Sequence, residues 1–97
     1  MKIVVFDAKP YDIEFFNKWN KEFGAQITYF EEKLSLKNVM LTKYQDVVCT
    51  FVNDDLNEKV LNILSKNGVR VVAARCAGYN NINLKAAREN RITVLRV

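Results

Sequence analysis

The stretch VRVVAARCAGYNN (residues 69–81) combines an element of the fold with a candidate binding site. Its first six residues form an apolar run of the length of a buried strand, and a helix-like pattern follows at 84–89. Between the two, the small residues Ala77 and Gly78 let the backbone approach a ligand closely, with N–H groups pointing at it. Arg75 adds a positive charge beside this turn. The pattern predicts a site for a small carboxylate. An ordinary strand-to-helix turn is the alternative, and the short motif alone favours it.

An apolar run followed by a helical pattern recurs along the whole chain. Ile13, Phe16, Trp19 and Phe23 have helical spacing up to the candidate C-cap Gly24. Strict alternation of strands and helices predicts a parallel sheet with helices on both faces. We therefore expect an α/β, flavodoxin-like, doubly wound sheet of five strands in the order 2-1-3-4-5. Strands are expected at 3–6, 27–30, 47–52, 69–74 and 92–97. Helices are expected from Pro10, after the caps Ser35 and Asn83, and from a polar start at 53–55 through Leu56 and Leu64 to Gly68.

In such sheets ligands bind beyond the carboxyl ends of the strands, where the strand order reverses. The segments expected there are 7–10, 51–55 and 75–81. The small-residue turn thus falls in the crevice that the topology selects, which favours a binding role for it.

Composition limits the classes of function. Ninety-seven residues make one small domain, and the net charge of +4 comes from scattered lysines, with only the tail (Arg88, Arg91, Arg96) locally basic. We therefore expect no nucleic-acid partner, and no run is long enough for a signal peptide or a membrane span. Cys49 and Cys76 could form one disulfide, but two buried free thiols in the cytoplasm are the favoured interpretation.

The chain lacks the residues that most catalytic sites need. It has no histidine, so neither cysteine has the usual base, and no cysteine–histidine cluster predicts a metal site. Its three glycines are too far apart for a phosphate-binding loop. We therefore expect no catalytic residue, no cofactor-binding residue and no metal ligand in this chain. Its last run stops inside a strand, which suggests a small domain with an unusual end or the front of a longer chain.

Four motifs resemble a known family. FDAKPYD (6–12), FVND (51–54), RCAGYNNINLKAA (75–87) and ITV (92–94) are similar, in order, to the N-terminal segment of NAD-dependent D-lactate dehydrogenases. These enzymes belong to the D-isomer-specific 2-hydroxyacid dehydrogenases. The first and third motifs are typical of the D-lactate branch, and the resemblance covers the whole chain.

The resemblance implies that residues 1–97 are a portion of the substrate (catalytic) domain of an enzyme that interconverts pyruvate and D-lactate. In that family, NAD is bound by a following domain, a C-terminal part completes the first domain, and the enzyme is a homodimer. The catalytic Arg, Glu and His lie beyond position 97, so the fragment alone should be inactive.

The resemblance also suggests individual roles. The N–H groups of Ala77 and Gly78 would hold the substrate carboxylate, and Tyr79 would shape the pocket wall. Phe51 would face the substrate's side group, although a core role at a strand end is equally open. Arg75 could contact the ligand, but a surface ion pair is the more common situation. Asp7 is expected to form a strand-end turn. Asn81 and Asn83 are assigned mainly to structure: Asn83 stands where the family more usually has Asp, and either residue type can cap a helix.

Two other classes of function stay open. A phospho-receiver domain shares this fold, but it needs an acidic pair after strand 1, a phosphorylatable Asp at the end of strand 3 and a Lys after strand 5. Here strand 1 offers only Asp7, Asp54 comes late in its turn, and the last strand ends without a Lys. A simple binding module for small carboxylates is the other alternative.

Overall fold

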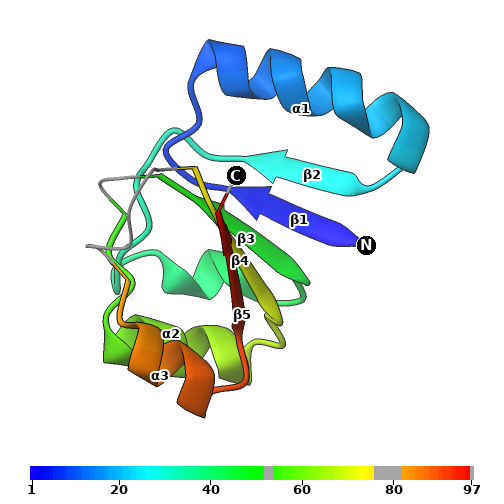
Figure 1. The fold of residues 1–97 in the computed structure, drawn as a ribbon. Helices are drawn as coiled ribbons and strands as arrows, with labels where there is room; N and C mark the ends of the chain where they lie inside the picture. Colours follow the sequence, from blue (N-terminus) through cyan, green and yellow to red (C-terminus); the bar gives the residue numbers. More distant parts are fainter. Residues whose placement is uncertain (52–53, 76–81, 97) are drawn as a thin grey trace.

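The computed structural model describes residues 1–51, 54–75 and 82–96 of the chain (Figure 1). Five strands alternate with three helices and one 3-10 turn. The strands are β1 Lys2–Val5, β2 Gln26–Tyr29, β3 Val47–Thr50, β4 Val71–Ala74 and β5 Thr93–Arg96. The helices are α1 Pro10–Phe23, α2 Glu58–Lys66 and α3 Leu84–Glu89, and the 3-10 turn η1 is Val39–Thr42.

The sheet has the predicted topology. All strand pairs are parallel, and the order is β2-β1-β3-β4-β5. Val48 of β3 pairs with Val4 of β1 on one side and Val72 of β4 on the other, and all three side chains are fully buried. The strand order reverses between β1 and β3, so their carboxyl ends border the crevice where ligands bind in this class of sheet.

The two faces of the sheet are covered unequally. Helices α2 and α3 and the turn η1 lie on one face, and α1 lies on the other (Figure 1). The larger core is on the α2 and α3 side and contains the fully buried Leu56, Leu61 and Leu64. The smaller core, under α1, is built around Val5 and Cys49.

Helix α1 buries only part of the aromatic stripe that its sequence carries. Ile13 and Phe16 pack on the smaller core, but Trp19 is 36% exposed and Phe23 is 60% exposed, and their rings stack at 4.4 Å. An apolar hollow of about 490 Å³ lies between α1 and the sheet, lined in part by residues of β3, β4 and β5. Helical spacing shows which side chains share a side of a helix, but not how much of that side the sheet covers.

Several local expectations were wrong. The helix expected after Ser35 is reduced to η1, because the Ser35 N–H donates to Asn38 and the Ser35 hydroxyl accepts from Lys37, which forms a turn instead. Leu56 lies before α2, in an isolated bridge to Ile82, and Asn57 caps the helix. Strands β3, β4 and β5 are shorter than expected, whereas β1 and β2 have the expected length and begin one residue earlier.

Two of the predicted caps, Gly24 and Asn83, are confirmed. Gly24 ends α1 with φ of 66°, a left-handed conformation that suits glycine. The Asn83 side chain accepts a hydrogen bond from the Ala86 N–H at 3.0 Å and so begins α3.

Candidate functional site

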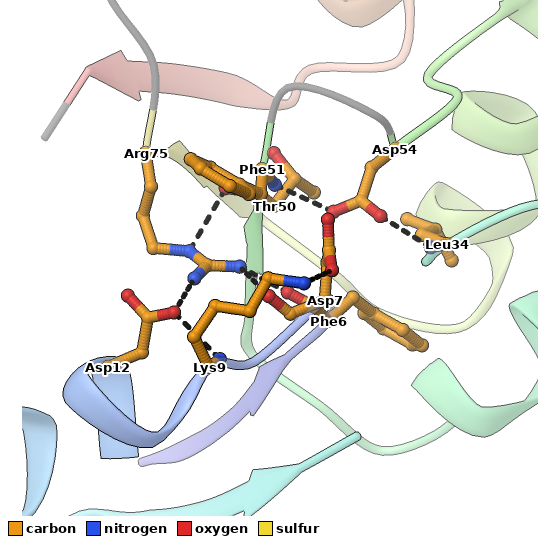
Figure 2. Close-up of polar contacts among 9 residues, drawn as sticks. All are labelled: Phe6, Asp7, Lys9, Asp12, Leu34, Thr50, Phe51, Asp54 and Arg75. Carbon is orange, nitrogen blue, oxygen red and sulfur yellow. Dashed lines mark hydrogen bonds and ion pairs between the residues drawn. The ribbon is translucent and has the colours of Figure 1, made fainter. Parts of the chain in front are cut away.

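The carboxyl ends of β1, β3 and β4 meet around one side chain, Arg75 (Figure 2). Arg75 directly follows β4, and its N–H donates to the Thr50 carbonyl at the end of β3. The side chain then reaches across β3 to the end of β1 and the first turn of α1 (Figure 2). The site is thus a meeting point of three strand ends, and the segment 76–81 continues from it.

Arg75 forms a buried ion pair with Asp12. Its Nη1 lies 2.6 Å from the Asp12 Oδ2, and the two side chains are only 9% and 11% exposed. The expectation of a surface ion pair was therefore right about the kind of contact and wrong about its place. A buried pair of this kind stabilises only where both charges are well matched, because desolvation of each is costly.

The guanidinium of Arg75 also donates to main-chain carbonyls. Its Nε donates to Thr50 at 3.2 Å, and its Nη2 donates to the carbonyl of Phe6 and, at 3.4 Å, to that of Asp7. Its central carbon lies 5.0 Å from the centre of the Phe51 ring, a cation–π distance. One side chain thus links three strand ends and one aromatic ring.

A second buried acid, Asp54, fixes the main chain after β3. Its carboxylate accepts hydrogen bonds from the Phe51 N–H at 2.7 Å and the Leu34 N–H at 2.6 Å, and the residue is 1% exposed. Burial raises the pKa of the Asp54 carboxyl to about 6, against the opposing effect of these two hydrogen bonds. A carboxylate enclosed in this way is poorly placed to accept a phosphoryl group, which disfavours the receiver alternative.

Asp7 makes the turn after β1, as expected. It has φ of 51°, a left-handed conformation that Asp tolerates better than most residues, and its Oδ1 accepts from the Lys9 Nζ at 2.8 Å. The Asp12 Oδ2 accepts from the Lys9 N–H at 2.9 Å at the start of α1. Acidic side chains therefore already occupy the N-terminal end of α1.

Comparison with known proteins identifies the family. The profile of the D-isomer specific 2-hydroxyacid dehydrogenase catalytic domain matches residues 3–97. The chain belongs to this family. The 2-hydroxyacid dehydrogenase homolog 1 of Schizosaccharomyces pombe is 46% identical to it over 97 residues, which are all of this chain and 29% of the relative. The D-lactate dehydrogenase of Escherichia coli is 40% identical over 97 residues, all of this chain and 30% of that enzyme.

Solved structures agree with this assignment. The apo-structure of D-lactate dehydrogenase from Escherichia coli superposes with a TM-score of 0.97 and 40% identity, covering all of this chain and 31% of that one. D-lactate dehydrogenase with NAD⁺ from Lactobacillus jensenii superposes with a TM-score of 0.88 and 28% identity, covering all of this chain and 30% of that one. The chain therefore spans about three tenths of the length of the relatives it matches.

The structure places only part of the predicted dehydrogenase site. Ala77, Gly78 and Tyr79, with Cys76 and Asn81, lie outside the described residues. Phe51 is described: it is half-buried, and its ring faces Arg75. Cys49 is a buried free thiol, as expected, and burial raises its pKa to about 11.

The residues of this chain do not fit the NAD that the family implies. A dinucleotide places its pyrophosphate on the N-terminus of the helix after the first strand, beside closely spaced glycines. Here that end of α1 carries Asp7 and Asp12, the latter bonded to the Lys9 N–H, and the segment 6–12 contains no glycine. Within residues 1–51, 54–75 and 82–96, no group of three or more possible ligands could hold a metal ion, and no helix is long and apolar enough to cross a membrane.

The sequence placed Asp54 in a segment expected at the crevice without showing its contacts, and it did not reveal Asp12 as part of the site. Asp54 stands three residues after Phe51 and Asp12 three residues after Lys9, a spacing at which an Asp side chain bonds back to the main chain. That signal indicates a local turn, but it does not show that Asp12 pairs with Arg75 or that Asp54 also binds Leu34.

Proposed function

We propose that this chain is a portion of the substrate domain of an NAD-dependent D-lactate dehydrogenase that interconverts pyruvate and D-lactate. The observation that carries the proposal is the meeting of Phe51 and Arg75 at the carboxyl ends of β3 and β4, directly before the RCAGYNN turn. An aromatic wall beside a turn rich in main-chain N–H groups suits a small acid with an apolar side group.

Each pocket residue has a proposed role. The N–H groups of Ala77 and Gly78 hold the substrate carboxylate, Tyr79 lines the wall, and the ring of Phe51 faces the methyl group of pyruvate. If this side of the pocket is small and apolar, as the proposal requires, larger 2-oxo acids should fit poorly.

The remaining parts of the enzyme lie outside this chain in the proposal. Relatives are more than three times as long as the matched segment, which leaves room for a nucleotide-binding domain and for the residues that exchange protons with the substrate. NAD held there supplies the hydride chemistry. We propose a homodimer of the longer protein and a cytoplasmic location.

The test is an assay of the longer protein encoded by the gene that contains this segment. With pyruvate and NADH, we expect oxidation of NADH and formation of D-lactate, identified by chiral chromatography. The 97-residue chain alone should show neither turnover nor measurable calorimetric affinity for oxamate, a pyruvate mimic. Absence of NADH oxidation with every 2-oxo acid tried would reject the proposal, and formation of L-lactate would reject its stereochemical part. Tight binding of oxamate by the short chain would favour a simple carboxylate-binding module.

A further inference from the structure

We propose that Arg75 is a positioning residue that holds the Phe51 ring as a wall of the substrate pocket. The inference rests on the proposed function, because it assigns a role in substrate selection. Its physical basis is the set of contacts drawn in Figure 2.

The guanidinium is itself held in one position. Asp12 pairs with one edge, while the carbonyls of Thr50 and Phe6 accept from the others. These acceptors belong to α1, β3 and the end of β1, so a movement of the guanidinium would break contacts with three different elements. At 9% exposure, little water is available to replace them.

The Phe51 main chain has a second support besides Arg75. Arg75 binds the Thr50 carbonyl just before it, and the Phe51 N–H donates to the buried Asp54, so Asp54 still holds this peptide when the Arg75 contact is changed. The guanidinium lies 5.0 Å from the centre of the Phe51 ring, so it acts on the orientation of the ring. A desolvated cation attracts an aromatic face more strongly than an exposed one does, so this contact favours one ring orientation.

The charge balance around Arg75 indicates that it positions the Phe51 ring rather than binding the substrate directly. The carboxylate of Asp12, 2.6 Å away, neutralises the guanidinium, and the carbonyls occupy further donors. Arg75 therefore serves the pocket through the ring it holds. Lysine could keep the charge, but it lacks the planar fork that reaches several acceptors and lies flat against a ring.

The test compares substrate selectivity in variants of the full-length dehydrogenase. The readout is the ratio of kcat/KM for pyruvate to kcat/KM for phenylpyruvate, a bulkier 2-oxo acid. We expect Phe51→Ala and Arg75→Lys each to lower this ratio about tenfold or more, because both loosen the same wall. The double variant should show no larger change than Phe51→Ala alone, since Arg75 acts only through the ring. Arg70→Lys, the same substitution at an exposed site just before β4, should leave the ratio unchanged.

A merely structural role predicts a different result. Arg75→Lys would then lower the melting temperature, or reduce both kcat/KM values equally, with the ratio constant within about twofold. That outcome overturns the proposal, as do independent effects that multiply in the double variant. If Arg75→Lys does not fold, Asp12→Asn is tested in its place, because it removes the charge that holds the guanidinium while keeping the size of the side chain. A constant ratio in Asp12→Asn also overturns the proposal. An unchanged ratio in Phe51→Ala overturns it while leaving the dehydrogenase activity in place, whereas an inactive parent enzyme rejects the proposed function itself.

Discussion

Titration of Asp54 should make this domain less stable as the pH rises through the weakly acidic range. Burial raises the pKa of Asp54 from its ordinary value of 3.8 to about 6 in the folded state. The folded state binds this proton more tightly than the unfolded state does. Protonation of Asp54 therefore contributes to the free energy of unfolding; this contribution is fully present below pH 3.8 and is lost as the pH passes 6. A difference of about two pKa units corresponds to about 3 kcal/mol of unfolding free energy.

Urea unfolding of the chain at several pH values between 4 and 7.5 measures this effect. Other carboxyl groups contribute their own pH dependence, so the informative quantity is the difference between the wild type and Asp54→Asn. From the lowest to the highest pH, we expect the free energy of unfolding of Asp54→Asn to rise by about 2–3 kcal/mol relative to that of the wild type. Asp55→Asn makes the same chemical change on an exposed neighbour and should give a much smaller pH-dependent difference. A difference for Asp54→Asn that stays flat, or that moves toward the wild type as pH rises, would refute the reasoning.

Three further predictions concern stability and reactivity. Leu64→Ala removes a fully buried side chain of the larger core and should cost roughly 2–5 kcal/mol in urea unfolding, whereas Leu84→Ala, at a 43% exposed position, should cost much less. Asn57→Ala removes the hydrogen bond from the Val60 N–H at the start of α2 and should cost about 1 kcal/mol in the same assay; no loss would show that the cap is dispensable. Cys49 should react slowly with iodoacetamide at pH 8, because it is buried and its pKa is about 11; peptide mapping that finds it labelled as fast in the native chain as in urea would contradict its placement.

The sequence alone predicted the topology because one regular pattern runs through the chain. Apolar runs that alternate with helical spacing leave few arrangements other than a parallel sheet covered on both faces. It predicted the caps Gly24 and Asn83 for a similar reason, since a cap depends on residues next to it in the chain. It failed at Ser35, where local side-chain hydrogen bonds compete with a weak helix.

The family also followed from the sequence, because the motifs that carry the resemblance are continuous segments of the chain. The place of these motifs at the carboxyl ends of the strands could be inferred as well, since a parallel sheet brings those ends to one edge.

The environment of each charged group needed the tertiary structure. Nothing near Arg75 in the sequence shows that Asp12 is its partner, because the two residues meet only after β1 and β4 have joined the same sheet. Whether Trp19 is covered likewise depends on how far α1 extends over the sheet. Periodicity and motifs are local properties of the chain, whereas burial and charge pairing arise between segments that only folding brings together.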